Sequence, residues 1–227
     1  MAAPVFFFLM GYARSRTIPL HWIWLGVILT LLDSWNANWG WVAPNILFSM
    51  AFIRLSRPGV LRLLQRFGWV ALLVLVLGLL AMLPFAGNLV DYGAEGWLWA
   101  LFGLCQRMYI ESRSPACLDG TSELTRQGMK WNWRIMGLVA GSITAVVYVW
   151  QEQIAFFFSD IQLTAVAIGV GVLSLVLSVF VRGPSPIQPP ESIARPLRFL
   201  GRHTLEIYVI QLAGFELIIN FLPQFAV

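Results

Sequence analysis

Two long stretches of this sequence contain no charged residue, and they limit what the chain can fold into more than any other feature. They are FGWVALLVLVLGLLAML at 67–83 and LTAVAIGVGVLSLVLSVFV at 163–181. A helix needs about 20 apolar residues, with a range of roughly 17–25, to cross the hydrocarbon core of a bilayer. Both stretches therefore predict transmembrane helices, and they argue against an ordinary water-soluble enzyme.

The composition of the whole chain agrees with this prediction. Of the 227 residues, 59% are hydrophobic and 11% are charged, whereas soluble domains are roughly 45–50% apolar and about 25% charged. We predict an all-α fold, a polytopic membrane helical bundle that forms a single transmembrane domain over residues 1–227 with about eight transmembrane helices. The apolar segments are 1–13, 19–35, 39–53, 67–87, 92–108, 132–151, 160–181 and 202–222.

Positive charge is confined to alternate connections between these segments. The fourteen arginines and the single lysine all lie in 12–18, 54–66, 107–134 and 182–202. In the other connections every charged residue is acidic. Connections rich in Lys and Arg stay on the cytoplasmic side of a membrane. The pattern predicts a multi-pass membrane protein, surrounded by lipids, with both termini on the outer side.

The first segment is shorter than a complete crossing. Thirteen residues precede Arg14, which is roughly 20 Å of helix against a hydrocarbon core of about 30 Å. No positively charged region precedes it, so it does not resemble a secretory signal. The segment is either a half-helix buried in protein or the end of a longer N-terminal region. We expect the second, a truncated N-terminus.

A histidine and a glutamate in the last segment are the candidate catalytic residues. His203 and Glu206 are three residues apart, a spacing at which two side chains of a helix can touch. A carboxylate that orients an imidazole makes a general base. The alternative is that Glu206 neutralises Arg202 or His203 and holds the end of the helix at the membrane interface.

The candidate cofactor-binding residues are Arg14, Arg16 and His21, which the charge pattern assigns to the same, inner side as His203. Arginine suits phosphate groups because its guanidinium can form two parallel hydrogen bonds. The alternative is that these arginines only orient the protein in the membrane and that His21 is an ordinary interfacial residue.

Other classes of site have no motif in this chain. The sequence contains no Walker loop, HExxH, GxSxG or CxxC motif, and the spacing of Cys105 and Cys117 matches no metal site. The arginines are distributed among the connections, as topology requires, so we predict neither a metal site nor a nucleic-acid partner.

Four stretches, in this order, resemble motifs of one family. APVFFFLMGYARSR at 3–16 resembles the "(F/A)P-x-F-x-F-L-(x)-GY" motif of the TraX family, PNILFSMAFIRL at 44–55 its "N-(I/V)-LF" helix, and DYGAEGWLWALF at 91–102 its "DYG-x-x-G" helix. FLGRHTLEIYVIQL at 199–212 is similar to the closing "R-x-TLEIY" helix that TraX shares with the wider superfamily of integral-membrane acyltransferases.

The resemblance implies an inner-membrane acyltransferase that moves an acetyl group from acetyl-CoA to a protein N-terminus, such as that of a pilin, or to another amine or hydroxyl acceptor. Family members begin with one more helix, which ends in an Asp-His type signature and has no counterpart here. Gln211 occupies the position after Tyr208 and Ile210 where the superfamily often has a histidine. The alternatives are a small-solute transporter, with Glu206 and Glu216 as proton or substrate sites, and a non-catalytic membrane assembly protein.

The charge pattern makes a prediction about topology. Reporter fusions at residues 60, 120 and 190 should report the cytoplasm, and fusions at 90, 155 and 227 should report the outer side, because all positive charge lies in alternate connections. A cytoplasmic C-terminus would contradict the eight-crossing arrangement.

Overall fold

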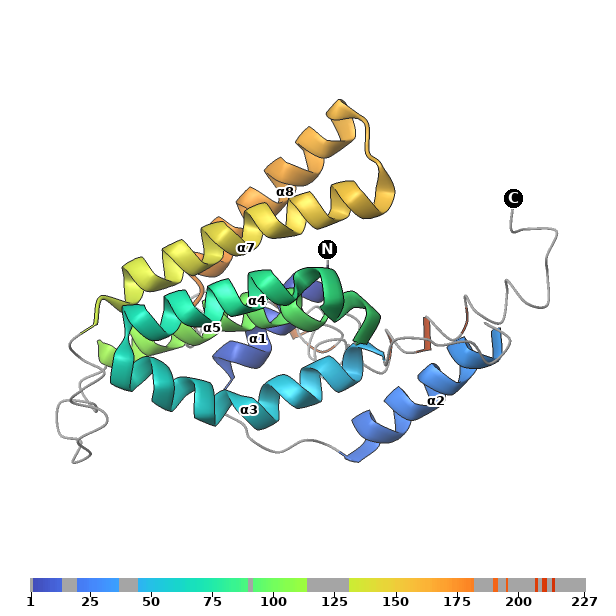
Figure 1. Ribbon diagram of the computed structural model, residues 1–227, viewed down its shortest axis with the longest axis horizontal. Helices are drawn as coiled ribbons and strands as arrows, with labels where there is room; N and C mark the ends of the chain where they lie inside the picture. The colour runs from blue at the N-terminus through green and yellow to red at the C-terminus, as the bar shows by residue number, and fades with distance from the viewer. Residues whose placement is uncertain are drawn as a thin grey trace.

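The computed structural model describes residues 2–13, 20–36, 45–89, 92–113 and 131–181, together with single positions at 190, 191, 195, 207, 210, 211 and 214. These ranges contain helices and no strand, which confirms the all-α prediction for this part of the chain (Figure 1). The helices are α1 (Ala2–Tyr12), α2 (Leu20–Asn36), α3 (Ile46–Phe67), α4 (Trp69–Leu89), α5 (Gly93–Ser112), α7 (Trp133–Phe156) and α8 (Asp160–Ser178).

Six of these helices lie close to predicted apolar segments, and α3 does not. The predicted segment ends at residue 53 and is followed by a connection over 54–66, whereas α3 continues to Phe67. Asn45 caps its start with a side chain that accepts a hydrogen bond from the Leu47 amide, and Gly68, which has a φ of 53°, caps its end. Arginine is a good helix former, so a charged connection can continue a helix. The predicted segment 202–222 lies outside the described ranges, apart from single positions.

Two of the described helices, α7 and α8, are long and apolar enough to cross a membrane by length and composition. Shorter apolar helices lie at Ala3–Tyr12, Trp22–Leu31 and Trp69–Phe85. The structure therefore supports membrane association of this part of the chain.

Helix α5 is the centre of the bundle. It packs against α1, α3, α4 and α7 (Figure 1), and it is buried almost continuously from Ala94 to Gln106. Helices α7 and α8 form a hairpin that extends beyond the other helices (Figure 1). The hairpin is joined to the bundle where Gly137 and Gly141 of α7 face Cys105 and Phe102 of α5.

Helices α1 and α5 approach each other closely, because glycines let the two backbones meet. A Cβ atom on Gly103 would overlap the carbonyl oxygen of Phe8, and one on Gly11 would overlap the carbonyl oxygen of Ala100. Small residues at helix contacts allow this kind of approach in membranes, where van der Waals packing drives helix association. The Phe8 and Phe102 rings then meet edge to face, with centroids 5.0 Å apart.

We predict that Gly103→Ala destabilises the protein. The added methyl group has to push α1 away from α5, and overpacking of this kind costs about 1–3 kcal/mol. The measurement is the midpoint of unfolding in detergent, followed by circular dichroism.

Gly78→Ala is the matched control, since Gly78 is also in a helix and an added methyl group there would have no heavy atom of a neighbour within 4 Å. The control should unfold no earlier than the wild type, because alanine favours a helix more than glycine does. Equal stability of the two variants would contradict the close contact.

Candidate functional site

Most of the predicted site residues lie outside the ranges that the structure describes. This holds for the catalytic candidates His203 and Glu206 and for Arg14 and Arg16. His21 is the second residue of α2, and only its backbone is described. The structure therefore leaves the His203–Glu206 pair as a prediction, but it does describe both flanks of the connection that contains Arg14 and Arg16.

The first flank is the end of α1, and two arginines bind it. The Nη1 atoms of Arg57, in α3, and of Arg107, in α5, both donate to the carbonyl oxygen of Ala13, the residue before Arg14; the Arg107 bond is 3.1 Å long. Arg57 also donates to the carbonyl oxygen of Met10 at 3.3 Å. The last carbonyl groups of a helix lack helical partners and carry partial negative charge. Here the guanidinium groups of Arg57 and Arg107 supply the missing hydrogen-bond donors.

The second flank is the start of α2, and an arginine one turn before Arg57 contacts it. The guanidinium carbon of Arg54 lies 4.6 Å from the ring centroid of Trp22, the neighbour of His21 in the sequence. Arg54 and Arg57 are three residues apart and therefore share a face of α3. This face links the end of α1 to the start of α2, on either side of the connection 14–19.

Further basic residues gather at the same end of the bundle. Arg113 and Arg134 lie over the Tyr109 ring at 4.8 and 5.9 Å, and the Trp131 indole donates to the Gln65 carbonyl oxygen at 3.2 Å. These contacts join the ends of α3 and α5 to the start of α7. We call Arg54, Arg57, Arg107, Arg113 and Arg134 the basic end.

The basic end can attract an anion, but Arg57 and Arg107 are held by hydrogen bonds within the protein. Arg57 is 3% exposed and bonded to backbone carbonyls, and Arg107 also pairs with Glu111 at 3.0 Å. These two residues position the α1 end from which Arg14 follows. The charge pattern of the sequence accounts for the presence of Arg54, Arg57 and Arg107 by membrane topology alone. The spacing of Arg54 and Arg57 along one helical face was the available signal that some of these arginines point inward.

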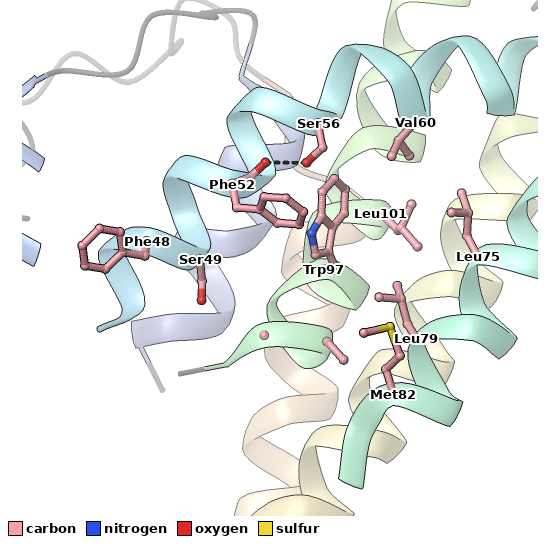
Figure 2. A pocket seen from close by; sticks show the side chains of 12 residues that line it. Phe48, Ser49, Phe52, Ser56, Val60, Leu75, Leu79, Met82, Trp97 and Leu101 are labelled. Atoms are coloured by element: carbon pink, nitrogen blue, oxygen red, sulfur yellow. Dashed lines mark hydrogen bonds between the residues drawn. The ribbon is translucent and has the colours of Figure 1, made fainter. Parts of the chain in front are cut away.

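A separate cavity of about 460 Å³ lies between α3, α4 and α5 (Figure 2). Phe52 and Trp97 meet edge to face across it, with centroids 6.4 Å apart, and the Ser56 hydroxyl donates to the Phe52 carbonyl oxygen. None of its lining side chains is titratable. This cavity suits an apolar group and offers no acid–base chemistry. Its lining is Phe48, Ser49, Phe52, Ser56, Val60, Leu75, Leu79, Met82, Gly93, Ala94, Trp97 and Leu101.

Comparison with known proteins identifies no family for this chain. No protein-family model, curated protein or solved structure matches this chain. The resemblance to TraX therefore rests on the four sequence motifs alone.

We predict that Arg57→Met destabilises the protein. The change leaves the carbonyl group of Met10 without its arginine donor and the carbonyl group of Ala13 with Arg107 alone, and an unsatisfied buried polar group costs about 1–3 kcal/mol. The measurement is again the unfolding midpoint in detergent.

Arg62→Met serves as the control, because Arg62 is an exposed residue of the same helix. It should change the midpoint little. Arg57→Lys should lie between the wild type and Arg57→Met, since lysine keeps the charge but presents a single donating group. A stable Arg57→Met variant would show that the hydrogen bonds of Arg57 to the end of α1 contribute nothing to stability.

Proposed function

We propose that this chain is a polytopic inner-membrane acyltransferase of the TraX type, with about eight crossings, that transfers an acetyl group from acetyl-CoA to an amine or hydroxyl acceptor. The proposal has three supports: the exposed apolar surface, the separation of charge along the bundle, and the packing of the motif segments.

The exposed surface of α8 supports a lipid environment. In its most apolar 18-residue window only 11% of the residues are buried, and Ile161, Leu175 and Val179 are between 68% and 84% exposed. Soluble monomers rarely expose a continuous apolar surface of this size. Lipid chains are the natural neighbours of such a helix.

The separation of charge supports the proposed orientation. The arginines of connections 54–66 and 107–134 meet at the basic end, and the Glu95 and Glu152 carboxylates lie toward the other ends of α5 and α7. The basic end would face the cytoplasm, where acetyl-CoA is found, and both chain termini would face the outer side.

The packing of the motif segments is the main support for the proposed relationship to TraX. The first three motif stretches form α1, the start of α3 and the start of α5, and these helices contact one another. Motif residues make the contacts: Gly11 meets Ala100, the Phe7 ring lies against Gly96, and Asn45 begins α3. A shared packing unit of this kind explains why these motifs would occur together.

In the proposed reaction His203 acts as the base and Glu206 orients it. His203 takes a proton from the acceptor amine as the nitrogen attacks the thioester carbonyl carbon. A C–N bond forms, the C–S bond breaks, and the CoA thiolate leaves and takes up the proton. Arg14 and Arg16, with His21, would hold the CoA phosphates beside the basic end, where Arg57 and Arg107 position the end of α1.

The test is acetyl transfer from acetyl-CoA to a short peptide with a free N-terminal amine, catalysed by the full chain in nanodiscs. Glu206→Gln should slow transfer by roughly 10²-fold or more, the usual scale for acid–base catalysis. His203→Ala should cost about as much, and the double variant little more, because the two residues act as a unit. Full activity of Glu206→Gln per folded molecule would remove this pair from the site.

Acetyl-CoA binding, measured by titration in the same nanodiscs, tests the donor side. Changing Arg14 and Arg16 to Gln should weaken binding by roughly tenfold or more per residue, since a hydrogen bond to a charged group contributes about 1.5–3 kcal/mol. Arg62→Gln is the matched control and should bind as the wild type does. Unchanged affinity in the double variant would leave these arginines as topology signals.

A further inference from the structure

The cavity between α3, α4 and α5 is used neither by the proposed reaction nor by the contacts of the basic end. Its lining residues on α3 include Phe52, Ser56 and Val60, which are four residues apart. On α4 the lining extends from Leu75 to Met82, seven residues along the helix (Figure 2). Residues at these spacings share one face of a helix, and the two stripes are each about 10–12 Å long. The cavity therefore follows the helices as an elongated space.

The lining offers few hydrogen-bond partners for water. The polar side-chain atoms of the described lining are the hydroxyl groups of Ser49 and Ser56 and the indole nitrogen of Trp97. The Ser56 hydroxyl already donates to the Phe52 carbonyl oxygen in its own helix. A buried water typically makes about 2–4 hydrogen bonds, and apolar cavities stay dry. Water is therefore not the expected occupant.

The size of the cavity favours a ligand. Its volume of about 460 Å³ lies in the range of roughly 300–1,000 Å³ that is typical of ligand sites. Protein interiors are close-packed and contain few voids larger than a water molecule. An apolar space of this size is therefore expected to hold an apolar molecule.

The cavity opens toward the outside of the bundle between α3 and α4. Phe52 and Met82, at its edges, are 60% and 51% exposed, whereas Trp97 and Leu101 of α5, at its base, are 9% and 1% exposed. The outer face of α4 beside the opening is also apolar and includes the exposed Leu77. In a membrane such an opening leads into the hydrocarbon layer, where the neighbouring molecules are lipid chains.

The chemistry of the lining favours a phospholipid over a free fatty acid. None of the described lining side chains is titratable, so the cavity provides no partner for a carboxylate, and burying an unpaired charge is unfavourable. The headgroup of a phospholipid stays at the membrane surface. One of its chains can then enter the cavity from the side while the other remains in the bilayer.

We propose that this cavity binds one acyl chain of a bilayer phospholipid. The chain enters sideways between Phe52 and Met82 and lies along Trp97 and Leu101. The site rests on the proposed membrane location of the bundle. It is independent of the proposed acetyl transfer, because none of its lining residues takes part in that reaction.

The test is photocrosslinking of the full chain in phosphatidylcholine vesicles that contain a phosphatidylcholine with a diazirine in one acyl chain. The sample is irradiated either in the vesicles or after transfer to a mild detergent and removal of free lipid, and labelled residues are mapped by mass spectrometry. In vesicles we expect labels on α8, whose surface is exposed, and on Trp97 and Leu101, which are buried at the base of the cavity. In detergent the labels on Trp97 and Leu101 should remain, and those on α8 should be lost.

Two outcomes of this experiment would overturn the proposal. The absence of label on Trp97 and Leu101 in vesicles would show that no lipid chain enters the cavity. Loss of their label in detergent together with that of α8 would show only the exchangeable lipid that surrounds any membrane protein.

A substitution that fills the cavity provides a second test. Leu79→Trp places a larger side chain in the lining and should abolish the labelling of Leu101. Leu77→Trp is the matched control, because it makes the same change in the same helix at an exposed position outside the lining, and it should be labelled as the wild type is. Added phosphatidylcholine should also raise the unfolding temperature of Leu77→Trp more than that of Leu79→Trp, since a ligand stabilises the folded state that binds it. Equal labelling of Leu101 in the two variants would contradict the proposed site.

Discussion

The close contact of α1 with α5 determines where the other parts of this bundle lie. Because Gly11 and Gly103 have no side chains, the two backbones touch, and the Phe7 and Phe8 rings fill the space beside them. The contact also brings the end of α1 to Arg107. Helices α3 and α7 then pack around α5, and their charged side chains reach positions set by this central pair.

Two buried charges illustrate how differently the ends of the bundle are built. Arg57 is 3% exposed and satisfied by the carbonyl groups at the end of α1. Glu95 is 9% exposed and has an unpaired oxygen within the described structure. A paired buried charge holds a structure together, whereas an unpaired one requires a proton or a ligand. This contrast is why we interpret the basic end as partly structural.

The motif stretches that resemble TraX have an evident physical role in packing. Gly11, Gly96 and Asn45 are explained by close approach and by the start of a helix, without reference to catalysis. The proposed chemistry instead depends on His203, Glu206, Arg14 and Arg16, which lie outside the described residues. The packing role and the proposed chemistry therefore belong to different parts of the chain. Unfolding measurements test the packing role, and acetyl-transfer measurements test the chemistry.

The sequence by itself determined the helical class and most helix positions, because uncharged apolar runs such as 67–83 and 163–181 leave the backbone few other ways to satisfy its hydrogen bonds in an apolar environment. It did not determine which of the charged residues outside those runs are buried. The charge pattern assigns Arg57 to a connection, whereas Arg57 is buried within α3. Glu95, near the start of the predicted segment 92–108, is also buried, which the sequence did not indicate. Burial depends on which neighbour covers a side chain, and only the packing of α3 and α7 around α5 decides that.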